Sequence, residues 1–258
     1  MNKKLELTLL ISVILISVFG LIMIYSASYI WADFKYGDAL KFVKNQGLFL
    51  IIGIFLMLFI SKIDYHILYK KSNTILLICV ILLVLVLIPG FGTVRNGSRS
   101  WFGIGSFGIQ PSEFAKPIII VCLALIFDKY YKFLRNKNLK HYNVIGLILF
   151  VGLMIPAIIF LQKDLGTMLI IVAIFFVMFF ASPILKQEKI KVIGLLTVLF
   201  LFAILIMKSV TGHVLSEAQM ARFNYFNPCS NYETGGYQIC NGFIAINNGG
   251  LLGNGIGN

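Results

Sequence analysis

The chain reads Asn96-Gly97-Ser98-Arg99-Ser100-Trp101-Phe102-Gly103, and shortly afterwards Gln110-Pro111-Ser112-Glu113-Phe114-Ala115-Lys116, between two apolar runs that are each long enough to cross a bilayer. The second stretch places a glutamate and a lysine three residues apart at the mouth of the following apolar run. Ionisable side chains are costly at membrane depth, and where they occur they usually mark a functional site. These stretches therefore predict a membrane fold and the place where its chemistry lies.

The composition agrees with a polytopic membrane protein. The 258 residues are 59% apolar and 12% charged, whereas a soluble domain carries roughly 25% charged residues. A net charge of +12 is compatible with nucleic-acid binding, but most lysines and arginines fall in short loops between apolar runs, which indicates membrane topology. The run from Leu5 to Ile24 exceeds the roughly 7–15 residues of a signal-peptide core. We therefore expect surrounding membrane lipid, no nucleic-acid partner, and a first transmembrane helix.

Seven apolar runs predict an all-α bundle with seven transmembrane helices in this chain. Each run has close to the roughly 20 residues that a helix needs to cross about 30 Å of hydrocarbon, and helices satisfy the backbone polar groups that lipid cannot. The expected spans are 6–28, 43–61, 73–90, 110–127, 142–161, 165–182 and 191–209. Residues 1–209 would form the helical bundle, and residues 210–258 the first part of a large extracytoplasmic loop.

Basic residues concentrate in alternate loops, and the positive-inside rule makes these loops cytoplasmic. They are Lys3, Lys4, Lys62, Lys70, Lys71, Lys129, Lys132, Arg135, Lys137, Lys140, Lys186, Lys189 and Lys191. The N-terminus is then cytoplasmic. The expected outer segments are 29–42, 91–109 and 162–164, together with the residues after about 210.

Glu113 and Lys116 share one face of the expected helix because they are three residues apart. One interpretation is a structural ion pair near a helix start, where a glutamate also suits the helix dipole. The other is a charged lining for a cavity open to the outer leaflet. Pro111 fits the first turn of a helix, and Ser112 is a candidate N-cap for it.

Other polar residues of the expected outer segments are candidates for the same cavity. Asp164 begins the sixth span and fits either an N-cap or a carboxylate that faces the cavity. Arg95 and Arg99 flank the turn signal Asn96-Gly97. A guanidinium group suits a phosphate, although interfacial arginines also meet lipid headgroups. Arg222 is a weaker candidate of the same kind.

The cysteines fall into two pairs. Cys229 and Cys240 both lie in the expected outer loop, where disulfides persist, so a bridge between them is expected. Cys79 and Cys122 lie inside spans and fit the role of small apolar residues. The histidines are scattered along the chain, so the sequence predicts no metal-ligand cluster.

Four groups of residues, in this order, resemble the SEDS family (shape, elongation, division and sporulation), the FtsW/RodA/SpoVE-like proteins. They are Asn96 to Trp101, Gln110 to Lys116, Gln162-Lys163-Asp164-Leu165-Gly166-Thr167, and Gly236-Tyr237-Gln238 leading to Ala245-Ile246 and Gly249-Gly250. They cover the chain from about residue 90 to its end. The resemblance implies a multi-pass protein of the bacterial plasma membrane whose parent has ten helices, and the expected topology agrees with the first seven.

The resemblance also implies an enzyme, a peptidoglycan glycosyltransferase that polymerises glycan strands from lipid II in cell division or elongation. Its implied partner is a class B penicillin-binding protein. The residues that match functionally important charged positions, and are the catalytic candidates, are Glu113, Lys116 and Asp164. The substrate-binding candidates are Arg95, Arg99, Gln110, Ser112 and Arg222.

Two departures from the family pattern stand out. Lys163 occupies a position where the family usually has proline, so we expect the start of the next helix to differ. The family's catalytic aspartate lies in the outer loop beyond residue 258, and three further helices follow it. We therefore expect this chain to be a truncated form without the general base.

Glycosyl transfer from a polyprenyl pyrophosphate needs a base for the acceptor proton and positive charge to offset the departing pyrophosphate. The candidates for that charge are Arg95, Arg99 and Lys116, oriented by Glu113 and Asp164. A divalent cation, Mg²⁺ or Mn²⁺, is the alternative source. Two other functions stay open: a lipid II flippase or other transporter, since charged intramembrane residues also mark transport paths, and a non-catalytic scaffold that recruits a penicillin-binding protein.

Overall fold

The computed structural model describes residues 3–95, 97–103, 108–136, 139, 141–212, 228–230, 236–250, 253 and 255. The chain divides into two compact units. One consists of Met1–Ile63 and Ile204–Asn258, and the other of Asp64–Ala203. The second unit contains the residues that the sequence marks for chemistry between positions 95 and 167.

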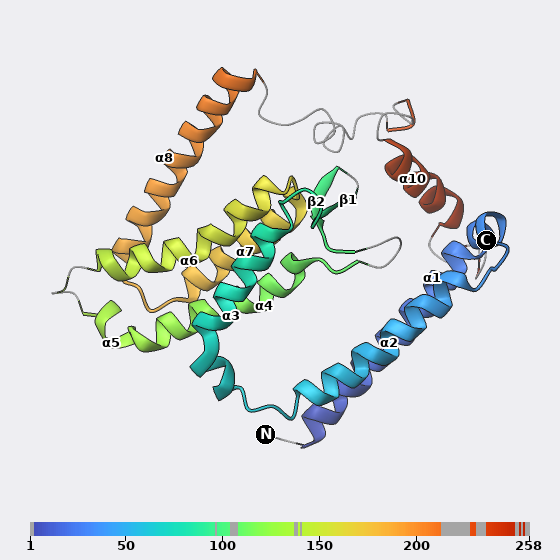
Figure 1. The fold of residues 1–258 in the computed structure, drawn as a ribbon, viewed down its shortest axis with the longest axis horizontal. Helices are drawn as coiled ribbons and strands as arrows, with labels where there is room; N and C mark the ends of the chain where they lie inside the picture. Colours follow the sequence, from blue (N-terminus) through green and yellow to red (C-terminus); the bar gives the residue numbers. More distant parts are fainter. Residues whose placement is uncertain are drawn as a thin grey trace. The chain divides into compact units, whose positions relative to one another are not determined.

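The described residues are mainly helical, with one short pair of strands (Figure 1). The elements in chain order are α1 (Lys3–Tyr36), α2 (Lys41–Ile60), α3 (His66–Leu85), β1 (Thr93–Arg95), β2 (Ser98–Trp101), α4 (Pro111–Lys129), α5 (Tyr131–Leu134), α6 (Tyr142–Leu161), α7 (Leu165–Ala181), α8 (Lys186–Thr211) and α10 (Tyr237–Gly249).

Five helices of the described chain are long and apolar enough to cross a membrane, namely α1, α2, α3, α6 and α8. Helix α7 is apolar but has 17 residues, and α4 carries the charged side chains of Glu113, Lys116 and Asp128. The all-α polytopic fold is therefore confirmed. The number of seven spans stays a prediction.

In the first unit, α1 and α2 form a helical hairpin. The sequence predicts an end near residue 28, but α1 continues to Tyr36; at about 1.5 Å per residue, its 34 residues extend further than a hydrocarbon core of about 30 Å. Asp38 closes the turn by accepting from the Leu40 backbone N–H (3.0 Å) and pairing with Lys44 (2.9 Å). The Lys44 hydrogen bond is the main reason why the pKa of Asp38 lies below its ordinary value. The turn is therefore tied to the start of α2.

The core of the second unit lies among α3, α4, α6 and α7, which run close together in Figure 1. Fully buried aliphatic and aromatic side chains fill it, including Leu83, Ile119, Leu123, Ile148, Ile155, Ile159, Ile171, Phe175 and Phe179. Gly152 on α6 lets the Phe175 ring pack directly on the helix backbone, because a Cβ at position 152 would overlap that ring. At this position α6 and α7 are therefore in direct contact.

A β-hairpin lies between α3 and α4, in a segment where the sequence predicts no strand. β1 and β2 pair antiparallel, with Arg95 opposite Ser98 and a bulge near Thr93. Gly97 has a φ of +81°, which glycine adopts readily, in agreement with the turn signal at Asn96-Gly97. The hairpin is two strands of three and four residues, too short for hydrophobic alternation to reveal.

Two further elements differ from the sequence prediction. Helix α3 begins at His66 and ends at Leu85, so Lys70 and Lys71, expected in a loop, lie in its first turns. Lysine is compatible with a helix end at a membrane because its long stem carries the ammonium group toward water. Helix α10 lies in the expected loop after residue 210, and Cys240 near its start forms a disulfide with Cys229.

Candidate active site

Three hydrogen bonds assemble the candidate site at one end of the helices in the second unit. The Gln162 side chain donates to the Leu83 carbonyl of α3 (2.9 Å), and the Gln162 carbonyl accepts from the Arg99 backbone N–H of β2 (3.0 Å). The Gln110 side chain, just before α4, donates to Asp164 (2.7 Å). Each bond joins residues that are far apart in the sequence, so the tertiary fold creates the site.

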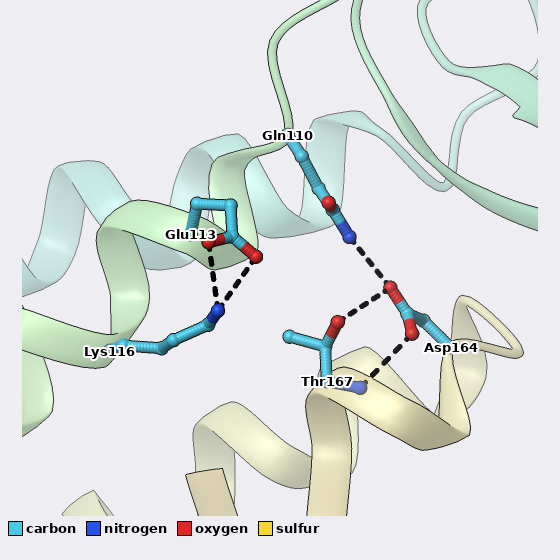
Figure 2. Close-up of polar contacts among 5 residues, drawn as sticks. All are labelled: Gln110, Glu113, Lys116, Asp164 and Thr167. Atoms are coloured by element: carbon cyan, nitrogen blue, oxygen red, sulfur yellow. Dashed lines mark hydrogen bonds and ion pairs between the residues drawn. The ribbon is translucent and has the colours of Figure 1, made fainter. Parts of the chain in front are cut away.

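Asp164 is the N-cap of α7 and the centre of a small hydrogen-bond network (Figure 2). Its Oδ1 accepts from the Thr167 backbone N–H (3.2 Å), and its Oδ2 accepts from the Thr167 hydroxyl (2.9 Å) and the Gln110 amide (2.7 Å). The first two bonds are ordinary capping, which the sequence anticipates. The third ties α7 to the start of α4, so the carboxylate is held from two elements.

Glu113 and Lys116 form an ion pair on the first turns of α4. The Lys116 ammonium lies 2.7 Å and 2.8 Å from the two carboxylate oxygens of Glu113. The side chain of Lys116 is 24% exposed and that of Glu113 is 55% exposed, so the ammonium is the better shielded partner. Gln110 belongs to the same turn, since its carbonyl accepts from the Glu113 backbone N–H (3.1 Å). The start of α4 therefore serves both the ion pair and the bond to Asp164 (Figure 2).

The suggestion that Ser112 caps α4 is wrong. The N-cap is Gln110, whose backbone is extended, and Pro111 occupies the first helical position. Ser112 lies in the first turn, is completely buried, and its hydroxyl has no hydrogen-bond partner within the described part of the chain. With the proline at the first helical position, the serine lies two residues past the N-cap and cannot cap the helix.

Both cations of the hairpin have defined contacts, within the hairpin or with the segments beside it. The Arg95 guanidinium lies 5.1 Å from the centre of the Trp101 ring, and it also covers Gly108 so closely that a Cβ there would collide with it. Arg99 reaches the Leu87 carbonyl with Nη1 at 3.4 Å, a long hydrogen bond, and is only partly exposed. Arg99 is thereby positioned against the end of α3, and Arg95 against an interfacial aromatic ring.

Sequence reasoning did not assign a role to Gln162, which is 1% exposed and bridges the hairpin and α3. The next residue, Lys163, has a φ of +61°, the one positive φ of a non-glycine residue in the described chain. Proline cannot adopt that angle, because its ring fixes φ near −65°. The expected difference at the start of α7 is thus a left-handed residue where the family pattern has proline.

The arrangement described above does not include two features that the sequence predicts, Arg222 and a divalent cation. Arg222 falls outside the described residues. Among the described residues, no group of three or more histidine, cysteine, aspartate or glutamate side chains lies close enough together to hold a metal ion. Glu113 and Asp164 already hold an ammonium and three hydrogen-bond donors, so neither is a ready ligand for Mg²⁺ or Mn²⁺, and the divalent cation stays a prediction.

The fold and the site together define a class of protein: a multi-pass helical membrane protein with charged and amide side chains gathered at one end of its helices. The chain belongs to the FtsW/RodA/SpoVE family of cell cycle proteins, whose family model matches residues 6–258. It is therefore a protein of the bacterial membrane.

Individual relatives agree with the family match. Stage V sporulation protein E of Bacillus subtilis is 40% identical over 257 residues, covering 98% of this chain and 66% of that protein. The probable peptidoglycan glycosyltransferase FtsW of Geobacter metallireducens is 31% identical, covering 99% of this chain and 65% of its own length. The FtsW of Bacillus subtilis is 30% identical, with 100% and 63% coverage.

A solved structure has a similar fold, with a TM-score of 0.59 and 25% identity over 91% of this chain and 65% of the other. Its description concerns the structural coordination of polymerization and crosslinking by a peptidoglycan synthase complex. The chain spans about two thirds of the length of the relatives that it matches.

Proposed function

We propose that the protein polymerises peptidoglycan glycan strands from lipid II, as an integral membrane glycosyltransferase, alongside a penicillin-binding protein. The observation that carries this proposal is the family match over residues 6–258, with relatives that are named peptidoglycan glycosyltransferases. The similar fold of a protein from a peptidoglycan synthase complex supports the partnership. The proposal concerns the activity of the whole protein.

The reaction joins an acceptor hydroxyl oxygen to the anomeric carbon of the donor sugar. The bond from that carbon to the pyrophosphate oxygen breaks, the acceptor proton passes to a base, and the pyrophosphate leaves with additional negative charge. Fixed positive groups that meet this charge stabilise the transition state more than the ground state. A site for this reaction therefore needs oriented cations beside a lipid-accessible surface.

Lys116 is our candidate for the cation that meets the pyrophosphate. Glu113 holds its ammonium with two short contacts, while the side chain keeps 24% of its surface exposed. A pre-oriented ammonium loses little freedom when it meets an anion, which is the condition for electrostatic catalysis. Arg99, fixed against α3 and Gln162, is the second cation that we assign to phosphate binding.

Asp164 has an orienting role in this proposal. Its two oxygens already accept three hydrogen bonds, from Thr167 twice and from Gln110. A carboxylate with that many donors holds its neighbours in place and is poorly disposed to take the acceptor proton. We therefore assign Asp164 to fixing the start of α7 against the start of α4.

The test is polymer formation by the purified whole protein, supplied with lipid II and a class B penicillin-binding protein. The unaltered protein should form glycan polymer, and both Lys116→Ala and Glu113→Ala should abolish it while the protein still accumulates in the membrane. Accumulation must be measured, because removing one partner of an ion pair can strand a charge. Normal polymer formation by both variants would leave the pair a structural role only. Lipid II transport without polymer would favour a flippase instead.

A further inference from the structure

Gln162 combines near-complete burial with incomplete hydrogen bonding. The side chain is 1% exposed, its Nε2 donates to the Leu83 carbonyl at 2.9 Å, and its Oε1 is buried without a partner in the described chain. Leaving a buried acceptor unsatisfied lowers the stability of the fold. An apolar side chain of similar size would avoid that cost but would remove the donor to the Leu83 carbonyl, so the bond to α3 is what a glutamine contributes here.

The backbone beside Gln162 is also under local constraint. Lys163 has a φ of +61°, a region that costs a non-glycine residue free energy and that persists where the surroundings impose it. Asp164, the next residue, begins α7 and carries the bonds to Gln110 and Thr167. Two unfavourable features thus directly precede the residue whose carboxylate organises the candidate site, and such features cluster at functional positions.

The contacts of Gln162 reach two other elements of the site, α3 and β2. Its side chain fixes the end of α6 to α3 through Leu83, and its carbonyl receives the backbone N–H of Arg99 at 3.0 Å. The chain then turns at Lys163 and presents Asp164 to Gln110. The Gln162 peptide therefore links the position of the Arg99 strand to the position of Asp164.

We propose that Gln162 is a positioning residue, which holds the Arg99 hairpin and the Asp164 carboxylate in one rigid frame through its bond to the Leu83 carbonyl. It touches no reacting atom; it acts through Arg99 and Asp164. The expected effect of Gln162 on turnover rests on the proposed glycosyltransferase activity. Its expected effect on the positions of the hairpin and Asp164 does not.

The first test uses Gln162→Met and Gln162→Glu in the whole protein, with lipid II as substrate. Gln162→Met keeps the length and removes the donor, so we expect kcat/KM to fall about 10- to 100-fold, as for small misplacements of reacting groups. A carboxylic acid at this position donates to Leu83 only while protonated. Gln162→Glu should therefore recover activity at low pH and lose it as the pH rises, a profile that neither the unaltered protein nor Gln162→Met shows.

The matched controls are Gln187→Met and Gln187→Glu, since Gln187 is an exposed glutamine in the first turns of α8. Both should leave kcat/KM and its pH profile unchanged. Equal activity of Gln162→Met and the unaltered protein would overturn the inference. So would a Gln162→Glu variant whose activity has the ordinary pH profile.

The second test does not depend on any activity. Spin labels at Val94→Cys on β1 and Leu169→Cys on α7, both exposed positions, report the distance from the hairpin to α7 in a Cys79→Ala and Cys122→Ala background. Gln162→Met should broaden the distance distribution, whereas Gln187→Met should not. An unchanged distribution in Gln162→Met would overturn the inference. If the protein forms no polymer but the distribution broadens, the proposed function fails and the positioning role stands.

Discussion

Only part of the hydrogen-bond network around Asp164 could be predicted from the sequence next to that residue. Capping by Asp164 was predictable, because an aspartate before an apolar run is a common helix start. Its bond to Gln110 spans 54 positions, and no local pattern reports such a pairing. Ser112 illustrates the opposite error, since a serine near a helix start is a common cap, yet the proline before it took the first helical position.

The Gln110–Asp164 bond should appear as energetic coupling. Gln110→Ala and Asp164→Ala should each lower polymer formation, and the double variant should lose less than the sum of the two single losses in free energy. A hydrogen bond to a charged group suggests a coupling of about 1.5–3 kcal/mol. The measurement is a double-mutant cycle on the polymerisation rate. Gln110→Ala combined with Asp128→Ala, at the other end of α4, is the control and should be additive; additivity in the first pair would refute the coupling.

At the scale of elements, the long helices follow from apolar runs, while the hairpin and α10 do not. Each of the seven apolar runs contains a helix, but α1 extends beyond the predicted end and α3 begins before the predicted start. Hydropathy does not register the helical turns that carry Lys70 and Lys71. The strands have three and four residues. The turn at Asn96-Gly97 was visible in the sequence, but the bond from the Arg99 backbone to the Gln162 carbonyl joins distant segments and was not.

The packing of α6 on α7 makes Gly152 a sensitive position. Gly152→Ala would place a Cβ in the Phe175 ring, so we expect the free energy of unfolding to fall by about 1–3 kcal/mol, as for other overpacked cores. Thermal unfolding of the purified protein in detergent measures the effect. Gly146→Ala on the same helix meets no atoms within 4 Å and should be neutral or slightly stabilising, because alanine favours helix.

A rescue distinguishes overpacking from a general weakness of α6. Combining Gly152→Ala with Phe175→Leu should recover part of the lost stability, because the smaller side chain gives the new methyl group room. If Gly152→Ala and Gly146→Ala behave alike, the close contact of the two helices is not the source of the sensitivity.

At the scale of the whole molecule, the direction of the chain across the membrane is still a prediction from its lysines and arginines. The segment around Leu139, which is 42% exposed, should be cytoplasmic. A membrane-impermeant thiol reagent should therefore modify Leu139→Cys only after the membrane is permeabilised. Val94→Cys, exposed on the hairpin, is the matched outer position and should react in intact cells. Reaction of Leu139→Cys in intact cells would overturn the orientation of every segment.

The covalent state of the cysteines gives a second test at this scale. The chain has four cysteines, of which Cys229 and Cys240 are bonded while Cys79 and Cys122 are free. Denatured protein should therefore take up two alkyl groups without a reductant and four after reduction, as mass spectrometry would show. Four groups before reduction would mean that the disulfide is absent.

Because of that disulfide, a sample with the correct sequence can still differ covalently from the protein described here. Two samples with the same 258 residues can differ by a single covalent link, according to whether an oxidant or a thiol was present where the chain was made. In the sample made with thiols, α10 lacks its anchor to Cys229, and α10 contains much of the last family motif. Cell-free synthesis in a thiol-containing mixture would thus yield a different molecule from the one described, with an identical sequence.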